Sequence, residues 1–422
     1  MRNSFDRSDS MAQIKPFTCL RPHTAVVARV AALPYDVYST KEAREVIEQE
    51  PLSFLKIDRA ETCFDHTMNP YDERVYEKAA ELLEQSKTDG IMICDEESSY
   101  YIYQLEMNQR VQTGIVACAS VDDYLNQVIK THENTRSEKE QDRIRHVEVC
   151  NAQTGPIFLA YRANEIINRE VEAVCKEEPL YHFIANDGVI HTVWKITNPV
   201  TTDTIAAEFA KIDQIYIADG HHRAAAAVKV ALKRRQLQEA LEPKLESDFF
   251  LSVLFPDDQL MILPYNRCVT DLNGWTKEEF LEQVSQNFVI KECGSEPYAP
   301  VKKGEFGMFL DEVWYQLSLK PGTSILKDSV SNLDVSILHH YLIEPVLGIT
   351  EPKTDQRIDF IGGIRGLKEL EHRVHTDMKV AFSMYATDIH EVFSVSDEQK
   401  LMPPKSTWFE PKLRSGLFIH EI

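Results

Sequence analysis

The chain has 422 residues, of which 43% are hydrophobic, so it is long enough to form two or three domains with buried cores. It carries 67 acidic and 46 basic side chains, a formal net charge of -21, and such a field repels nucleic acids and anionic lipids. We therefore expect no nucleic-acid and no membrane partner, although a few basic groups converging on one cleft can still bind a small anion.

Eight cysteines are scattered along the sequence without a C-x-x-C pair or a closely spaced histidine. This pattern argues against a disulfide framework and against a structural zinc site. The first fifteen residues are polar, and no apolar run is long enough to cross a bilayer. From these features we expect a cytoplasmic protein.

The predicted elements alternate between strands and helices. A helix is predicted at residues 73–86, two strands joined by a polar turn at 108–110 lie between residues 100 and 121, and a charged stretch at 130–146 is typical of a solvated helix. A strand at 214–218 ends abruptly, and helix formers then continue to residue 241. The later predicted elements are strands at 249–255, 358–361 and 380–385 and helices at 336–347 and 389–400. This order predicts a mixed α/β fold.

The most informative motif is Asp219-Gly220-His221-His222-Arg223, which lies between the strand and the Ala-rich helix. A helix start presents unpaired N–H groups and a partial positive charge, and both favour an anion. Gly220 permits a close backbone approach, and Arg223 offers a planar fork of donors for phosphate oxygens. The alternative is an ordinary Asp-Gly turn with surface histidines.

A second candidate is His132-Glu133, directly before the charged stretch. A carboxylate at a strand exit can act as a general base on a hydroxyl if the fold brings the two within reach. Taken alone, Glu133 is better interpreted as one more solvated acid, because Glu138 and Glu140 follow it closely.

A third candidate lies at residues 402–409, where two prolines end the preceding helix and display Lys405, Ser406 and Thr407 on a stiff loop. These three side chains suit an oxyanion. The alternative is a terminal clamp in which the aromatic residues at 408 and 409 pack onto the core, and both roles can hold at once.

Other noticeable residues are predicted to be structural. They include the corner at 34–37, the acids at 58–61, the glycine-rich segment at 362–366, which fits no phosphate-binding fingerprint, and His339 and His340, which fall in an apolar helical pattern. No chemistry follows from their spacing.

At these motifs the chain resembles the family known as domain of unknown function 1015. The resemblance is carried by residues 20–37, 53–57, 132–143, 219–227, 255–263 and 402–421. More remotely, the part from about residue 115 onward is similar to the archaeal free serine kinases, which have a ParB/sulfiredoxin-like fold. The resemblance implies a kinase-like core at residues 108–422, with insertions, and an extra N-terminal α/β unit at residues 14–107.

The same resemblance implies roles for the motif residues. Glu133 would be the catalytic base, with His132 beside the substrate and Asp219 near the transferred phosphoryl group. Nucleotide phosphates would be bound by Gly220, His221, His222 and Arg223, and the substrate by Lys405, Ser406 and Thr407. A basic residue of those kinases is replaced by Trp408 here, which puts the identity of the substrate in doubt.

The implied reaction is phosphoryl transfer between ADP or ATP and free serine, with Mg2+ accompanying the nucleotide. The partners would be an amino acid and a nucleotide. Two alternatives stay open. The same site could run toward free serine as a phosphoserine phosphatase, or the pocket could sense nucleotides without turnover as a regulator.

Overall fold

The computed structural model describes residues 11–237, 244–323 and 328–422. The chain divides into two compact units, the first comprising Met1–Leu260 and Pro411–Ile422 and the second Met261–Glu410. This division differs from the predicted one, because residues 14–107 lie within the first unit, together with much of the predicted core. The antiparallel hairpin of β4 (Tyr101–Met107) and β5 (Arg110–Ser120) spans the predicted boundary.

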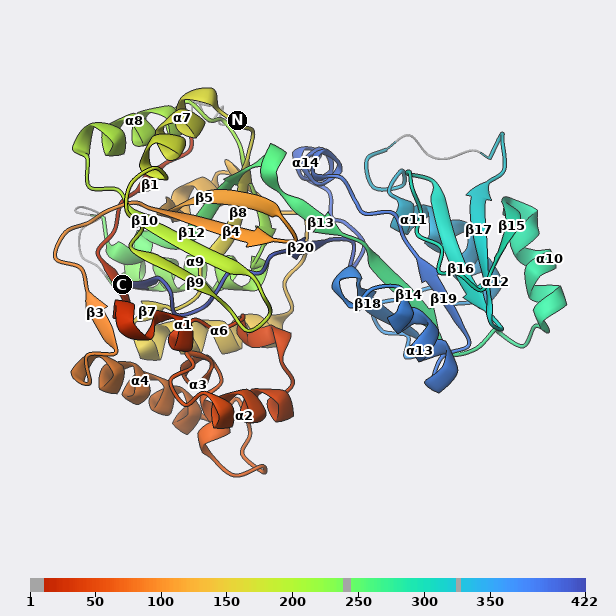
Figure 1. The fold of residues 1–422 in the computed structure, drawn as a ribbon, viewed down its shortest axis with the longest axis horizontal. Coiled ribbons are helices and arrows are strands. Elements are labelled where there is room, and N and C mark those ends of the chain that lie inside the picture. The colour runs from red at the N-terminus through yellow and green to blue at the C-terminus, as the bar shows by residue number, and fades with distance from the viewer. Residues whose placement is uncertain (1–10, 238–243, 324–327) are drawn as a thin grey trace, which may run out of the picture. The chain divides into compact units, whose positions relative to one another are not determined.

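The first unit is built on a mixed sheet, in which β4 and β5 are central (Figure 1). Among the described residues its strand order is β6-β11-β8-β12-β5-β4-β10-β9, and β1 pairs with β5. The other strands are β1 (Ile14–Lys15), β6 (Ile129–Lys130), β8 (Ile157–Tyr161), β9 (Tyr181–Ile184), β10 (Ile190–Lys195), β11 (Ile215–Asp219) and β12 (Phe249–Pro256). Strands β8 and β12 are buried along their whole length, as expected for continuous apolar runs in a sheet covered on both faces.

Helices surround this sheet. They are α1 (Val27–Val30), α2 (Thr40–Gln49), α3 (Leu55–Asp58), α4 (Glu73–Thr88), α5 (Val121–Leu125), α6 (Ser137–Cys150), α7 (Glu165–Val174), α8 (Pro199–Phe209) and α9 (His221–Leu237). The four alanines at 224–227 are all buried, which lets α9 pack closely. The part of its predicted helix beyond residue 237, up to 241, lies outside the described residues.

The N-terminal part of the first unit has an apolar core of its own. Helices α2, α3 and α4 lie together (Figure 1), and Phe54, Leu55 and Leu83 are buried in their cluster. Beside them lies a small sheet with the order β3-β2-β21-β7, formed by β2 (Cys19–Pro22), β3 (Met92–Cys94), β7 (Ala152–Gln153) and β21 (Ile419–Glu421). The C-terminal strand β21 thus pairs with segments far away in the sequence, and the last residues of the chain belong to this unit.

The second unit contains a six-stranded antiparallel sheet in the order β15-β17-β16-β19-β14-β18 and the pair β13-β20. Its strands are β13 (Met261–Leu263), β14 (Tyr265–Val269), β15 (Phe288–Gly294), β16 (Glu305–Leu310), β17 (Val313–Leu319), β18 (Ile358–Gly362), β19 (Val380–Ser383) and β20 (Trp408–Glu410). Its α-helices are α10 (Lys277–Asn287), α11 (Asp334–Leu338), α12 (Glu344–Leu347), α13 (Lys368–Thr376) and α14 (Ile389–Asp397).

The predicted helix at 336–347 is present but irregular, because a π-helical turn, His339–Ile343, separates α11 from α12. Pro345 has no N–H to donate to the Tyr341 carbonyl four residues earlier. The side-chain amide of Asn287 donates to that carbonyl instead, at 3.0 Å. The proline therefore gives a physical reason for the widened turn.

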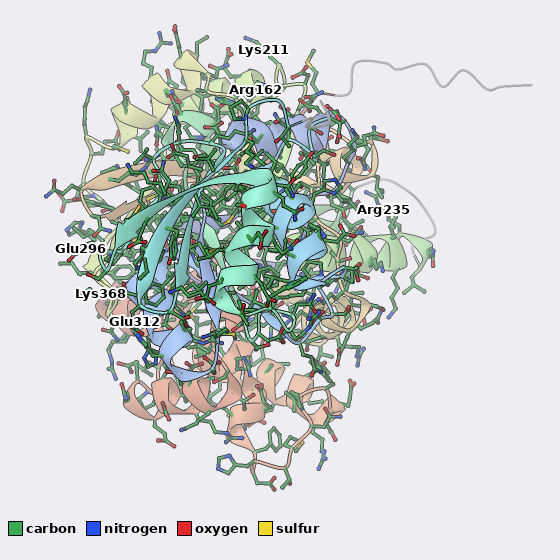
Figure 2. The ribbon with its side chains drawn as sticks, turned by 90° about the vertical axis from the view of Figure 1, so that its right-hand side faces the viewer. Arg162, Lys211, Arg235, Glu296, Glu312 and Lys368 are labelled. Carbon is green, nitrogen blue, oxygen red and sulfur yellow. The ribbon has the colours of Figure 1, made fainter. Side chains whose placement is uncertain are left out.

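These elements confirm the predicted mixed α/β fold. Charged side chains line the surface of both units (Figure 2), for example Arg162 and Lys211 in the first and Glu312 and Lys368 in the second. In the part of the chain that the structure describes, no helix has the length and apolar character needed to cross a bilayer.

Candidate active site

Two of the predicted motifs meet at one edge of the large sheet of the first unit. Strands β6 and β11 are parallel neighbours, with Ile129 opposite Ile215. The chain therefore leaves both strands at the same edge, so that His132-Glu133 emerges beside Asp219-Gly220. We call His132, Glu133, Asp219, His221 and Lys412, which pairs with Asp219, the strand-end cluster.

The two histidines of the cluster are stacked edge to face. The ring centroids of His132 and His221 are 4.5 Å apart with an interplanar angle of 86°, and both side chains are buried. Burial lowers the pKa of His132 to about 4 and that of His221 well below its usual range. Both rings are therefore neutral near pH 7, a state in which each has one N–H donor and one acceptor nitrogen.

Glu133 lies on the solvent-exposed side of the His132–His221 pair. Its Oε2 is 3.7 Å from His221 Nδ1, and its side chain is 46% exposed. Within the described residues, His132 Nδ1 and His221 Nε2 are buried without a hydrogen-bond partner. Buried polar atoms of this kind call for an explanation, and a bound polar ligand would supply one.

Asp219 is held by two donors. Its Oδ1 accepts the Gly220 N–H at 2.7 Å, and its Oδ2 accepts Lys412 Nζ at 2.8 Å. Burial alone would raise the pKa of Asp219, but the charges of Lys412 and Arg223 outweigh it and hold the pKa below its usual range. The carboxylate is therefore ionised, and it already has a cationic partner.

The turn into α9 needs its glycine. Gly220 has φ +92°, a conformation that side chains with a Cβ rarely adopt, and an added Cβ would lie 3.1 Å from Arg223 Nε and Nη2. Arg223 folds back beneath the turn, where its Nη1 donates to the Pro156 carbonyl at 2.5 Å. His222 points elsewhere: its Nε2 accepts the backbone N–H of Arg136 at 2.9 Å, next to the start of α6.

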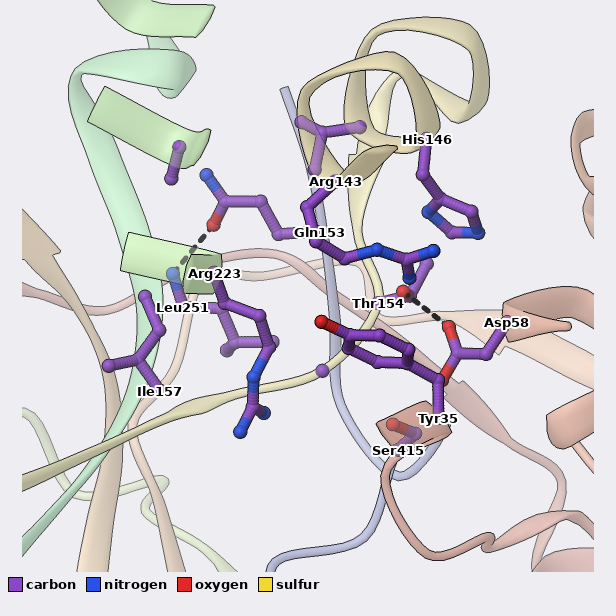
Figure 3. A pocket seen from close by; sticks show the side chains of 13 residues that line it. Tyr35, Asp58, Arg143, His146, Gln153, Thr154, Ile157, Arg223, Leu251 and Ser415 are labelled. Carbon is purple, nitrogen blue, oxygen red and sulfur yellow. Dashed lines mark hydrogen bonds between the residues drawn. The ribbon is translucent and has the colours of Figure 1, made fainter. Parts of the chain in front are cut away.

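A small cavity of about 30 Å³ lies beside Arg223, and we call it the arginine pocket (Figure 3). Its polar lining comes from α6, α9, the end of β7, the N-terminal segment and the C-terminal segment, and consists of Tyr35, Asp58, Arg143, His146, Gln153, Thr154, Arg223 and Ser415. The cavity has room for a few water-sized groups, which matches a single carboxylate or phosphoryl group rather than a whole nucleotide.

Two arginines give the arginine pocket its charge. The Arg143 guanidinium lies 3.9 Å from the centroid of the Tyr35 ring and pairs with Asp142 at 2.8 Å. Asp58 accepts the hydroxyl of Thr154 at 2.9 Å. The pocket thus contains two guanidinium groups that can bind an anion, and the carboxylate that also lines it, Asp58, already accepts the Thr154 hydroxyl.

The sequence did not point to several of these residues. Tyr35 and Asp58 were predicted to be structural, yet they line the arginine pocket, and Lys412 was not singled out. A signal was nevertheless available, because Tyr35, Arg143 and Ser415, which line the pocket together with Arg223, all belong to segments that carry the family resemblance.

The third motif lies in the second unit, so its part in this site stays a prediction. Lys405 has φ 58° and is exposed, with its Nζ 5.3 Å from the centroid of the Tyr265 ring. The Ser406 hydroxyl donates to the Pro403 carbonyl at 2.6 Å and holds the loop closed. Thr407 precedes β20, whose Trp408 packs against Tyr265 at a centroid distance of 5.1 Å. The predicted aromatic clamp is therefore present.

No group of three or more His, Cys, Asp or Glu side chains that could hold a metal ion occurs among the residues with described positions. Mg2+ stays an expectation, and it would enter this site as part of a nucleotide substrate.

Comparison with known proteins identifies a family. The family model described as "Protein of unknown function (DUF1015)" matches residues 14–336. No curated protein matches the chain.

Solved structures resemble the chain only weakly. A mutant free serine kinase in complex with ADP has 14% identity and a TM-score of 0.34, covering 73% of this chain and 93% of its own. A conserved hypothetical protein from Pyrococcus furiosus has 14% identity and a TM-score of 0.32, with 73% and 95% covered. C-terminally truncated SbnI from Staphylococcus aureus has 10% identity and a TM-score of 0.36, with 72% and 87% covered.

Proposed function

The chain belongs to the family described as Protein of unknown function (DUF1015), and for this member we propose a phosphotransferase acting between a nucleotide and the hydroxyl of free serine. The observation that carries the proposal is the meeting of Glu133 and Asp219 at the ends of two parallel neighbouring strands, beside the first turn of α9. Phosphoryl transfer needs little more than positioning, charge neutralisation and one base, and this cluster offers all three.

In the proposed forward reaction the serine hydroxyl oxygen attacks the terminal phosphorus of ATP or ADP. The new O–P bond forms as the bond from phosphorus to the bridging oxygen breaks, the shortened nucleotide (ADP or AMP) leaves with that electron pair, and the hydroxyl proton passes to the Glu133 carboxylate. Glu133 suits this role because its half-exposed side chain is accessible to a substrate. The neutral, buried His221 lies 3.7 Å from this carboxylate and brings no positive charge that would lower its ability to accept a proton.

The phosphates would bind at the first turn of α9, where N–H groups and the positive end of the helix favour anions. Arg223 and Lys412 supply the nearest fixed cations, and Mg2+ would arrive with the nucleotide. The carboxylate of serine fits the arginine pocket, where Arg143 and Arg223 face a cavity of matching size. Serine itself is assigned from the resemblance of the motifs to free serine kinases.

The proposal is tested by following both reactants and products. The protein is incubated with serine and either ATP or ADP, and separately with phosphoserine and either ADP or AMP, and phosphoserine, serine, nucleotides and free phosphate are quantified. The proposal predicts phosphoserine from the first set of mixtures and, from the second, ATP made from ADP or ADP made from AMP. Free phosphate from phosphoserine without any nucleotide would indicate a phosphatase instead. Nucleotide binding without product in any mixture would indicate a regulator.

A further inference from the structure

The second unit contains a large pocket that the proposed reaction does not use. Its volume is about 580 Å³, within the range of small-molecule sites. Apolar walls come from side chains that include Val330, Val335, Ile358 and Phe360. The pocket lies beside the π-helical turn His339–Ile343, and such turns are frequent at functional sites.

An arginine without an acidic partner lies at this pocket. The side chain of Arg267, on β14, is only 3% exposed. It donates to the backbone carbonyls of Tyr265 and Lys405, the latter at 3.0 Å, and its guanidinium lies 5.3 Å from the centroid of the Phe360 ring. No carboxylate in the described residues forms an ion pair with it. Burying a cation without an acidic partner costs free energy of desolvation, and an anionic ligand would compensate the charge.

Two further polar atoms at the pocket are also unsatisfied. Ser336 Oγ and His339 Nδ1 are buried, and neither has a hydrogen-bond partner among the described residues. His339 was predicted to be a packing or surface residue rather than a ligand, and its unpartnered Nδ1 leaves it available to a ligand. Glu351 is the one carboxylate among the described lining residues, and it is exposed. A cation without an acidic partner, an unpaired hydroxyl and an unpaired imidazole nitrogen thus surround one apolar cavity, a pattern typical of ligand sites.

We propose that this pocket binds a small organic anion, whose carboxylate or phosphate oxygens are held by Arg267 and whose apolar body lies against Phe360. Burial lowers the pKa of Arg267 to about 9, so the guanidinium still carries its charge at pH 7. The cation and the aromatic ring lie close together, which favours a ligand with a planar apolar body over a bare ion. This site goes beyond the proposed phosphoryl transfer and does not depend on it.

Four probe molecules separate the contribution of a ligand's negative charge to binding from that of its apolar ring. Calorimetry on the full chain at pH 7 measures binding of benzoate, phenyl phosphate, inorganic phosphate and benzyl alcohol. We expect benzoate or phenyl phosphate to bind at least tenfold more tightly than both inorganic phosphate and benzyl alcohol, and the tighter of the two tells a carboxylate ligand from a phosphate ligand. Equal binding of all four, or binding of none, would overturn the proposal.

Variants locate the binding. Arg267→Met should weaken binding of the preferred probe at least tenfold, the size expected for loss of a charge-assisted contact. Ser336→Leu, which fills the cavity, should do the same and keeps the test decisive if Arg267→Met fails to fold. Arg365→Met, at an exposed arginine of the same unit, is the matched control. Unchanged affinity in Ser336→Leu would refute the site, whereas Arg223→Ala should leave probe binding intact whatever its effect on phosphoryl transfer.

Discussion

Replacing Lys412 with Met tests whether charge governs the strand-end cluster. Lys412 Nζ lies 2.8 Å from Asp219 Oδ2, and the two side chains are 17% and 32% exposed. Two unit charges at this distance interact by roughly 1.5 kcal/mol in water and about 6 kcal/mol at an effective dielectric constant of 20. Partial exposure and the cost of desolvating both groups reduce this, so we expect a loss of about 1 to 2 kcal/mol in unfolding free energy at pH 7.

The pH dependence of this loss identifies its cause. The pKa of Asp219 in the folded protein lies below its unfolded value of about 3.9, so the ion pair stabilises the protein fully above that pH. Its contribution disappears as the pH falls further, through the folded pKa. The difference between wild type and Lys412→Met should therefore be constant from pH 7 to about pH 5 and shrink toward pH 3. Methionine keeps most of the aliphatic stem of lysine, so little packing is lost in the variant. Any stability that is lost through packing would be the same at every pH.

The assay must report on the first unit alone. Pulsed hydrogen exchange across a urea series, read by mass spectrometry on peptides from β11, does so at each pH. Lys78→Met is the matched control, because Lys78 pairs with Glu81 at the same 2.8 Å but on the surface of α4, where we expect a loss of at most about 0.5 kcal/mol. A difference for Lys412→Met that is equal at pH 7 and pH 3, or no larger than that of the control, would refute the electrostatic argument.

The remaining predictions concern the turn and its neighbours. Arg223→Ala should weaken nucleotide binding, measured by calorimetry, by roughly ten- to hundredfold. Arg162→Ala, at an exposed arginine, is the control and should bind nucleotide as the wild type does. If both variants bind nucleotide equally well, the role of Arg223 is structural. Gly220→Ala should lower the free energy of unfolding by about 1 to 2 kcal/mol and also weaken nucleotide binding. Gly90→Ala, at φ +68° with open space around it, should lower the free energy of unfolding but leave nucleotide binding unchanged. Unimpaired nucleotide binding in Gly220→Ala would contradict the prediction. Because burial lowers the pKa of His132 to about 4, this residue takes up a proton in the unfolded chain but not in the folded one between about pH 6.5 and pH 4, which removes about 1.4 kcal/mol of stability for each unit by which the pH falls. Burial also lowers the pKa values of His191 and His221, which add slopes of their own, so His132→Phe should reduce the slope measured by urea unfolding by about 1.4 kcal/mol per pH unit, and an unchanged slope would contradict the prediction.

Local patterns in the sequence predicted most of the elements correctly. The turn at 108–110 joins β4 and β5 through Asn108 and Gln109, which both have positive φ, and the helix predicted at 73–86 is α4 (Glu73–Thr88). These features depend on short-range preferences that are visible within a few residues. The π-helical turn was not predicted, because the Asn287 side chain that donates to the Tyr341 carbonyl lies 54 residues away in the sequence.

The candidate site was only partly predictable, for a similar reason. The pairing of β6 with β11 brings Glu133 and Asp219 together, but no local pattern reveals which strands are neighbours. Lys412 lies 193 residues from Asp219 in the sequence, and nothing in its own surroundings marks it as a partner. Glu140, expected to be solvated like Glu138, is instead buried and pairs with Lys229. Residues that act through long-range contacts leave little trace in a single sequence.

The central claim is that Glu133 is the base in phosphoryl transfer to serine, and the most direct test is steady-state transfer by Glu133→Gln. The amide keeps the shape of the side chain but cannot accept the proton, so we expect kcat to fall roughly a hundred- to ten-thousandfold with nucleotide affinity nearly unchanged. Glu138→Gln, at an exposed carboxylate five residues later, is the control and should retain wild-type activity. Equal activity of the two variants would contradict the account and return Glu133 to the role of a solvated surface charge.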